Sequence, residues 1–267
     1  MPWIARGLRE GIVTTRYPRR ADGYGKGFQA SVAVRAEALE RAREGLDLAS
    51  MVRLCPTGAI GVEADAVRLD RARCILCGRC VSACPDLFSF DEAIEIAVDH
   101  RELLVVPKGG GGLDEAMVEA HRQELAERVR PLRRSVHVRH VDCGSDGSGE
   151  WEIAALWNPV YDLQRLGVYL TASPRHADLL LVSGAGAAGM LEPLQEAYEA
   201  MAQPRVVVAI GTDAASGGLF AGTYATRSGV TEVPVDVYVP GSPPSPFSIL
   251  HGILLAIGLL PPTKRRT

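Results

Sequence analysis

Residues 177–189 read ADLLLVSGAGAAG, a short aliphatic run that passes directly into a glycine-rich loop. Two more β-branched runs follow, RVVVAI at 205–210 and VPVDVYV at 233–239. The residues at 191–201 and 245–260 have the composition of helices. Short apolar strands that alternate with helices at this spacing are typical of a mostly parallel, doubly wound sheet. The sequence therefore predicts an α/β fold for this half of the chain.

The loop after the first of these strands offers one possible ligand site. Gly184, Gly186 and Gly189 have the G-x-G-x-x-G spacing of dinucleotide-binding proteins, and Asp213 follows about where an acid that binds ribose belongs. Two features argue against such a site: the next helix opens with LEP (191–193), and this strand is third in order within the half. A flexible glycine loop is therefore the main interpretation, and nicotinamide or flavin binding is the alternative.

A cysteine-rich motif lies in the first half of the chain. The segment CILCGRCVSACP (74–85) has the C-x2-C-x2-C-x3-C-P spacing of bacterial ferredoxins. Its first three cysteines, here called the cysteine triplet, are Cys74, Cys77 and Cys80. In two-cluster ferredoxins the fourth cysteine of the motif, here Cys84, binds the other cluster. Cys55, which precedes a proline, stands where the corresponding cysteine of the other half would be.

Only one cluster is expected from this motif. Counting back from Cys55 by the same spacing gives positions that are not ligands, Gly45, Leu48 and Met51. We therefore expect one [4Fe–4S] cluster bound by Cys55 and the cysteine triplet, which leaves Cys84 without a partner. A second ligand set, with Cys84 in place of Cys55, remains open. Structural zinc is another alternative, although zinc sites favour paired C-x2-C knuckles.

Composition restricts the possible partners and location. The net charge of −3 does not indicate a nucleic-acid binder. The first residues lack a secretory signal, and no apolar run reaches the roughly 18 residues of a membrane span. We expect a cytoplasmic location, where six cysteines favour metal binding over disulfides. Basic residues crowd both ends, which indicates either solvated tails or docking on acidic lipid or an acidic subunit (Arg6, Arg9, Arg16, Arg19, Arg20, Lys26, Lys264, Arg265 and Arg266).

The order of these segments predicts the domain organisation. A glycine-rich break at 108–112 separates the cysteine-rich part from the α/β part, and the alanine-rich stretch 33–43 has the composition of a helix. We expect an irregular basic arm at 1–32, an α+β ferredoxin-like domain with a single [4Fe–4S] cluster at 33–110, a linker helix at 111–132, and the α/β domain at 133–267.

Five segments of the α/β half carry a family resemblance: YDLQRLGV (161–168), ASPRHADLLLVSG (172–184), PRVVVAIG (204–211), SGG (216–218) and PVDVYVPGSPP (234–244). Together they resemble the small subunit of membrane-bound [NiFe] hydrogenases of the formate hydrogenlyase type. They are also similar to the homologous quinone-proximal, cluster-bearing subunit of respiratory complex I.

The rest of the chain extends this resemblance. The cysteine block resembles the ferredoxin domain that some such subunits carry or pair with, and GIVTTRYP (11–18) is similar to that partner's N-terminal arm. The resemblance implies a flavodoxin-like fold for the second half. It also implies assembly with a large catalytic subunit and a membrane arm, at the inner face of the cell membrane.

The family's terminal [4Fe–4S] cluster is bound by four cysteines, and the resemblance places their positions at Asp146, Gly149, Asp213 and Ser242. Cys143 precedes the first position by three residues and cannot bind a cubane alone. Iron–sulfur clusters prefer soft thiolates. We therefore expect no second cluster and a hydrogen-bonded polar pocket, with a hard cation such as Mg²⁺ or an unusually ligated cluster as alternatives.

Two functions are compatible with these features, and no residue of the chain is expected to be catalytic. In the first, the chain is an electron-transfer subunit that exchanges electrons through one cluster with a soluble donor or another subunit. In the second, it is a structural bracket between a large subunit and an ion-translocating membrane arm. Electron transfer to the family's usual acceptor would need the missing ligands.

Overall fold

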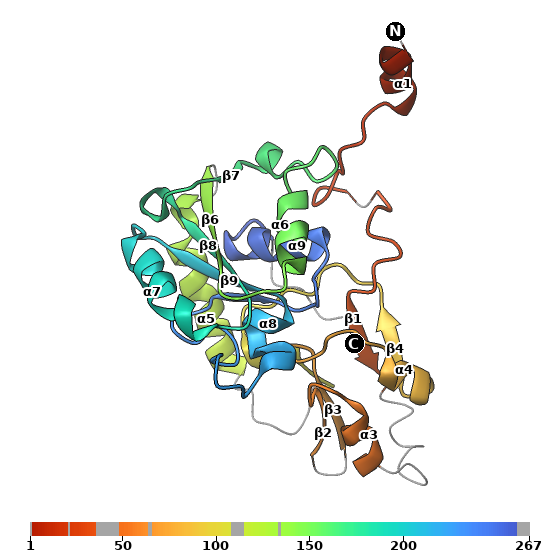
Figure 1. The fold of residues 1–267 in the computed structure, drawn as a ribbon. Coiled ribbons are helices and arrows are strands. Elements are labelled where there is room, and N and C mark those ends of the chain that lie inside the picture. The colour runs from red at the N-terminus through yellow and green to blue at the C-terminus, as the bar shows by residue number, and fades with distance from the viewer. Residues whose placement is uncertain are drawn as a thin grey trace.

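The computed structural model describes residues 2–20, 22–35, 48–63, 66–107, 115–132 and 135–260. Within them, a small region of antiparallel sheets is followed by a larger α/β region (Figure 1). Helix α1 (Pro2–Glu10) extends away from both regions. In the described parts, no helix is both long and apolar enough to cross a bilayer.

The α/β region is built on a five-stranded parallel sheet. Its strands lie in the order β10-β9-β8-β6-β7 (β6 Val136–Asp142, β7 Val168–Leu170, β8 Leu179–Ser183, β9 Val206–Ile210, β10 Val237–Val239). Numbered within this region, that order is 2-1-3-4-5, which is the flavodoxin-like arrangement. The predicted doubly wound fold is therefore confirmed.

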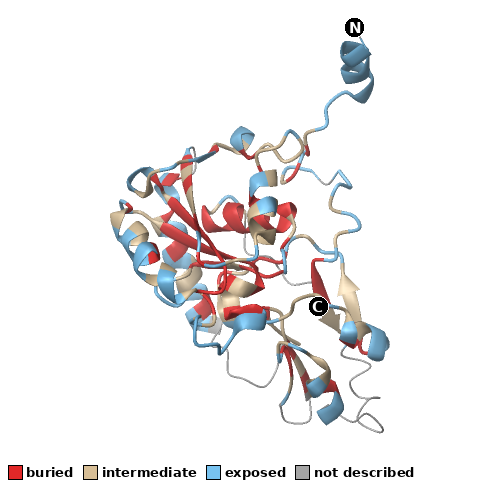
Figure 2. Cartoon of the chain, in the orientation of Figure 1, coloured by how far each residue is buried: buried red, intermediate tan, exposed pale blue. Residues whose placement is uncertain are grey.

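Helices cover both faces of this sheet because its central strands are apolar on both sides. All five residues of β8 and all five of β9 are buried, as expected for a parallel sheet covered on two faces (Figure 2). On one face, Leu179 and Leu181 pack in the same cluster as helices α6 (Ser148–Ala155) and α9 (Pro246–Ala256). On the other face, Leu180 and Val182 pack with α7 (Leu191–Ala200).

Helix α9 is the most deeply buried helix of the described chain. All 11 of its residues are buried, which is the expected position for a helix that is apolar on every side. Ser245 caps its first turn by accepting a hydrogen bond from the Ser248 amide. The short helix α8 (Gly211–Ser216) follows β9 directly and begins at the carboxyl edge of the sheet.

The cysteine-rich region consists of two small antiparallel sheets and short helices. Strand β1 (Ser31–Val34) pairs with β4 (Phe88–Asp91). Strand β3 (Ala66–Asp70) pairs with both β2 (Ile60–Glu63) and β5 (Val105–Val106). Helix α3 (Leu48–Leu54) precedes β2, and helix α4 (Arg79–Ala83) lies between β3 and β4. The expected small α+β region is therefore present.

Among the described residues, the remaining elements are helix α5 (Glu115–Arg128) and six 3-10 turns. Helix α5 lies where the linker helix was expected, although the 111–132 boundaries themselves stay a prediction. The 3-10 turns are η1 Arg101–Leu104, η2 Arg130–Leu132, η3 Leu163–Leu166, η4 Pro174–His176, η5 Ala188–Met190 and η6 Gly218–Phe220.

Two local expectations were wrong. The arm at 1–32 is not irregular throughout, because α1 and the first residues of β1 lie within it. The helix expected at 33–43 fails at its start, because Ala33 and Val34 pair with Ser89 and Phe88 in a sheet. Residues 36–47, the glycine-rich break at 108–112 and the basic residues at 264–266 lie outside the described residues.

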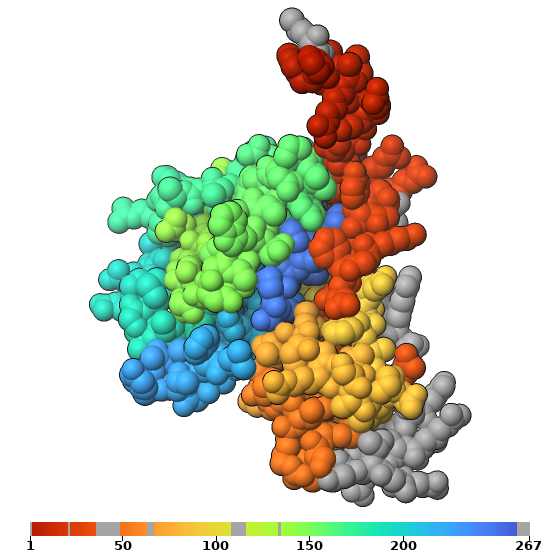
Figure 3. All heavy atoms as spheres, turned by 45° about the vertical axis from the view of Figure 1, so that its right-hand side comes forward, coloured from red at the N-terminus to blue at the C-terminus, as the bar shows by residue number. Residues whose placement is uncertain are grey.

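A short segment before η1 joins the two regions. Val98 and Tyr238 exchange two backbone hydrogen bonds of 3.0 and 2.8 Å, which adds an antiparallel bridge to the edge strand β10. The neighbouring Ala97 amide donates to Nδ1 of His251 on α9 at 3.3 Å. Figure 3 shows the cysteine-rich region in direct contact with the C-terminal part of the α/β region. The two regions therefore pack as one body around this segment.

Candidate metal centre

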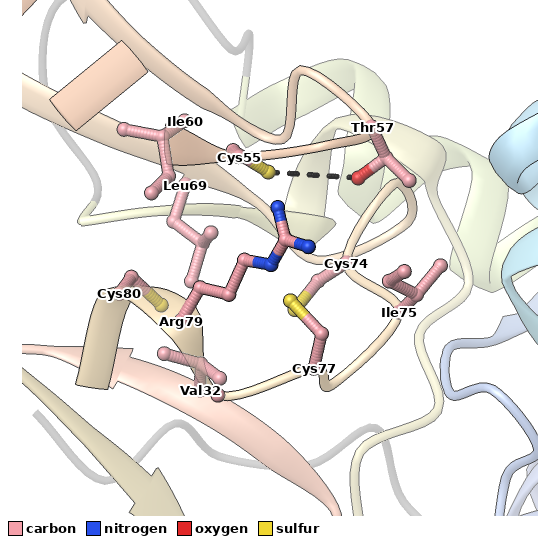
Figure 4. A pocket seen from close by; sticks show the side chains of 11 residues that line it. Val32, Cys55, Thr57, Ile60, Leu69, Cys74, Ile75, Cys77, Arg79 and Cys80 are labelled. Carbon is pink, nitrogen blue, oxygen red and sulfur yellow. Dashed lines mark hydrogen bonds between the residues drawn. The ribbon is translucent and has the colours of Figure 1, made fainter. Parts of the chain in front are cut away.

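Four cysteines line one cavity in the cysteine-rich region (Figure 4). Cys55 directly follows α3, Cys74 and Cys77 lie on the turn between β3 and α4, and Cys80 lies in α4. The cavity holds about 330 Å³ of empty space, part of which opens to solvent. Cys84, at the C-terminal end of α4, is not among the described residues that line it. The structure thus brings Cys55 together with the cysteine triplet and leaves Cys84 outside.

The turn that carries the cysteine triplet depends on two left-handed residues. Leu76 has φ 55° and Gly78 has φ 73°. A Cβ atom on Gly78 would lie 3.2 Å from Phe90 Cζ, so a larger residue would meet both a strained backbone and a close contact. The Thr57 hydroxyl donates to the Arg73 carbonyl at 2.6 Å and ties the Cys55 loop to this turn.

Hydrogen bonds and burial distinguish the thiols. The Ala59 amide donates to Cys55 Sγ at 3.2 Å, and the Thr57 hydroxyl lies 3.6 Å from the same sulfur. Burial alone would raise the pKa of the Cys55 thiol, but these hydrogen bonds outweigh it and the pKa is lowered. Burial raises the pKa of Cys74 to about 11, and neighbouring cysteines, including Cys80, add to the rise. Thiolates crowded in this way need a metal to take up their charge.

The lining of the cavity suits an iron–sulfur cluster. Its donors are soft sulfurs, and its wall includes the apolar residues Val32, Ile60 and Leu69. Figure 4 shows the Arg79 side chain extending among the cysteines, where it would face a negatively charged group. Among the described residues, no three His, Cys, Asp or Glu side chains are arranged to hold a single metal ion.

A second cavity lies at the carboxyl end of the parallel sheet. It is lined by all four positions that the resemblance assigned to the terminal cluster, and its empty space is about 290 Å³ (Asp146, Gly149, Asp213 and Ser242). Asp146 lies in the loop after β6, Gly149 in the first turn of α6, Asp213 in α8 after β9, and Ser242 in the loop after β10. They lie next to the point between β6 and β8 where the strand order reverses. Ligands of doubly wound proteins bind at such a point.

The second cavity is polar, and two carboxylates in or beside it, those of Asp146 and Glu150, accept hydrogen bonds. Asp146 accepts hydrogen bonds from the Ser148 hydroxyl and amide at 2.6 and 2.9 Å, which lower its pKa. Glu150 accepts from the hydroxyls of Ser145, at 2.6 Å, and Ser183. Burial would raise the Glu150 pKa, but these bonds lower it.

Asp213, which also lines this cavity, differs from Asp146 and Glu150. Burial raises its pKa, and the nearby carboxylates of Asp146 and Glu150 raise it further. Cys143 is buried in the core behind the loop, and its thiol pKa is raised to about 12 by burial and by Asp142. Cys143 is not among the described residues lining the cavity, so no thiol faces this space. The residues present do not fit a cysteine-ligated cluster.

Two amides of the glycine loop after β8 donate to backbone carbonyls of the protein itself. The amides of Ala185 and Ala187 donate to the Gly144 and Cys143 carbonyls, at 3.2 and 2.8 Å. A Cβ atom on Gly186 would lie 2.2 Å from the Gly229 carbonyl oxygen, so this glycine serves close packing of two loops. Gly184 packs in the same way against residues 143–144, whereas Gly189 meets nothing within 4 Å. The dinucleotide alternative therefore gains no support.

Two hydroxyls of α8 connect the cavities, and the sequence analysis missed both. Thr212, which lines the second cavity, donates to the Cys74 carbonyl at 2.9 Å, and Ser216 donates to the Ala72 carbonyl at 2.8 Å. These partners are separated by 138 and 144 residues, and no local pattern marks either hydroxyl. Helix α8 thus holds the cysteine turn against the parallel sheet.

Comparison with known proteins identifies the α/β region. The pattern of the family described as NADH ubiquinone oxidoreductase, 20 kDa subunit, matches residues 147–256. A probable membrane-bound hydrogenase subunit, mbhJ, of Pyrococcus furiosus is 41% identical over 143 residues, which are 52% of this chain and 86% of that protein. The chain belongs to this family. Its expected hydrogenase-like and complex I-like character is therefore confirmed.

Other relatives come from both branches of the family. Formate hydrogenlyase subunit 7 of Escherichia coli is 37% identical over 160 residues, which are 59% of this chain and 63% of that protein. An NADH-quinone oxidoreductase subunit of Citrifermentans bemidjiense is 43% identical over 104 residues, which are 39% of this chain and 61% of that protein. The matches thus span less than two thirds of the length of these two relatives.

The cysteine-rich region has its own match. The pattern of the 4Fe–4S single cluster domain covers residues 67–128. This range contains the cysteine triplet and Cys84, but it begins after Cys55 and does not include it. An iron–sulfur domain is therefore present, and the identity of the fourth ligand rests on the geometry of the cavity.

Proposed function

We propose that this chain is the iron–sulfur electron-transfer subunit of a membrane-associated oxidoreductase complex related to hydrogenases and complex I. Its one [4Fe–4S] cluster is bound by Cys55 and the cysteine triplet. The observation that supports this most strongly is that these four thiols, from two separate segments of the chain, line one cavity. The named relatives are subunits of formate hydrogenlyase, a membrane-bound hydrogenase and NADH-quinone oxidoreductase, so the partners are a large subunit and membrane-arm subunits.

The residues around the cavity have distinct roles toward this cluster. The cluster supplies a site for storing and releasing one electron, and its potential depends on hydrogen bonds to sulfur and on solvent exposure. The Ala59 amide donates to Cys55 Sγ and stabilises negative charge on it. The apolar wall excludes water on the inner side. Cys77 is exposed, so the side of the cluster next to Cys77 faces a soluble donor or a partner subunit.

No cluster occupies the second cavity in this proposal. Two carboxylates, one hydroxyl and one glycine stand at the four ligand positions, and none of these is a soft donor. Electrons that reach the first cluster therefore leave by another partner and not by the family's terminal cluster. The second cavity is a hydrogen-bonded polar pocket that keeps the shape of the loops.

A structural bracket is the alternative function. It is favoured by the loss of thiols at the second cavity together with the retained packing of α8, which still holds the cysteine turn through Thr212 and Ser216. In that case the chain joins a large subunit to an ion-translocating membrane arm and passes no electrons. Adding the electron donor to the intact complex separates the two functions, because only electron transfer changes the cluster's EPR signal during turnover.

The ligand set is tested by two matched serine variants, Cys55→Ser and Cys84→Ser. We expect Cys84→Ser to keep the iron content and EPR signal of the parent chain, because Cys84 lies outside the cavity. Cys55→Ser should lose iron or shift the signal. The reverse pattern, with Cys84→Ser losing the cluster and Cys55→Ser retaining it, would show that the ligand set is wrong.

A further inference from the structure

Helix α1 has an exposed surface that the rest of the chain leaves uncovered. None of its nine residues is buried, and it stands clear of the body (Figures 2 and 3). The chain returns to the body just after it, where the Thr14 hydroxyl donates to the Pro159 carbonyl and the Thr15 amide donates to the Val160 carbonyl, both at 2.8 Å. The position of α1 is therefore fixed at its base while its sides stay free.

The two sides of α1 differ in chemistry. At about 100° per residue, its large apolar residues fall on one side and its charged residues on the opposite side. The apolar side carries Trp3, Ile4 and Leu8, which are 72, 42 and 82% exposed, and Ile12 just beyond the helix is 86% exposed. The charged side carries Arg6, Arg9 and Glu10, with an ion pair of 2.8 Å between Arg6 and Glu10.

Such a helix needs a surface to bind. An isolated helix shorter than about 12 residues is only marginally stable in water. The free-energy cost of nucleating a helix exceeds the stabilisation from the few hydrogen bonds that a short helix forms. Packing of the apolar side against another surface would supply the missing stabilisation. In the described chain that side of α1 packs against nothing, so the surface belongs to something else.

Charge indicates the nature of that surface. Residues 1–27 contain six basic and two acidic residues, a net charge of +4, whereas the whole chain has −3. Arg16, Arg19, Arg20 and Lys26 are exposed beyond the helix and extend the positive region along the arm. A positive region beside an apolar helix side complements an anionic surface with an apolar interior.

We infer that α1 lies in the plane of an anionic lipid bilayer. Trp3, Ile4 and Leu8 enter the boundary between headgroups and acyl chains, while the arginines contact lipid phosphates. The helix is too short to span the bilayer, so it attaches the chain to one face. This inference goes beyond the proposed electron transfer and does not depend on the cluster.

Vesicle binding by the full-length chain tests the inference. The probes are phosphatidylcholine vesicles with about 30% phosphatidylglycerol and vesicles of phosphatidylcholine alone. We expect cosedimentation with the anionic vesicles, weakened by salt, and a blue shift of Trp3 emission. The double variant Arg6→Gln/Arg9→Gln should bind roughly 25-fold more weakly, at about fivefold for each cation. Trp3→Ser/Leu8→Ser should lose about tenfold or more.

A matched control is available in Trp151, which is 79% exposed and belongs to α6. Trp151→Ser should bind anionic vesicles as the parent chain does. Equal binding to neutral vesicles, or unchanged binding by both double variants, would overturn the inference. So would binding to poly-L-glutamate without binding to either vesicle, which would assign α1 to an acidic protein. Iron content measured on each variant separates any failure here from a failure of the proposed cluster.

Discussion

His251 links the stability of the packed body to pH. This histidine is buried in α9, and its Nδ1 accepts the Ala97 amide from the segment that joins the two regions. Burial lowers the pKa of His251 from its ordinary value of 6.5 to about 4, while Glu95 opposes the shift. The folded state therefore keeps the ring neutral at a pH at which the unfolded chain would protonate it.

The sign and size of the effect follow from this difference. Because the unfolded chain binds the proton more tightly, the stability contribution is complete above pH 6.5 and is lost as the pH falls toward 4. A tenfold difference in proton affinity is worth about 1.4 kcal/mol, so the full loss is about 3 kcal/mol, and about 2 kcal/mol of it is reached at pH 5. Replacing the ring by leucine should remove this dependence.

The assay compares the parent chain with His251→Leu in anaerobic urea unfolding between pH 7.5 and 5. The variant should be less stable at pH 7.5, since the Ala97 amide loses its acceptor, at a cost of about 1 to 3 kcal/mol. The difference should then shrink by about 2 kcal/mol at pH 5. Acid effects on the cluster act on both chains alike. A control variant at an exposed histidine, His176→Leu, should keep the parent's pH dependence. Parallel curves for the parent and His251→Leu would refute the reasoning.

Two further substitutions test the packing of the α/β region. In Gly252→Ala the new Cβ would lie 2.3 Å from Val239 Cγ2, so unfolding free energy should fall by about 1 to 3 kcal/mol, whereas Gly149→Ala, which meets nothing within 4 Å, should change it little. Asp236→Ala removes the carboxylate that pairs with Arg128 at an 8% exposed position, and thermal or urea unfolding should show a loss of about 3 kcal/mol. A loss below about 0.5 kcal/mol in either Gly252→Ala or Asp236→Ala would contradict the packing described here.

The sequence predicts the elements whose signal is local. Strands β8 and β9 are continuous apolar runs, because a parallel sheet covered on both faces buries every side chain. Strand β7 has only three residues, all of them apolar although Tyr169 and Leu170 are exposed, and a run this short does not identify a strand. The start of the expected helix at 33–43 fails for a different reason. There, Ala33 and Val34 pair with residues more than 50 positions away, and composition carries no information about such pairing.

In the candidate site, too, the sequence identifies residues that are close together along the chain, and it misses contacts between distant segments. The spacing of Cys74, Cys77 and Cys80 is local, so one turn brings them together and the motif identifies them. Cys55 lies further away and was reached only by counting along a ferredoxin template. The hydrogen bond from Thr212 to the Cys74 carbonyl joins residues 138 positions apart, and only the folded chain reveals it. The predicted cavity positions Asp146 and Asp213 do meet in one cavity, because parallel strands end at a common edge.

Iron and acid-labile sulfide per chain, measured on anaerobically purified protein together with an EPR spin count after reduction, test the central claim most directly. The account predicts about four irons, about four sulfides and one reduced [4Fe–4S] signal for each chain. About eight irons with two signals would place a second cluster among the oxygen donors of the second cavity. If no iron were found, the first cluster would not exist. Either result would contradict the account.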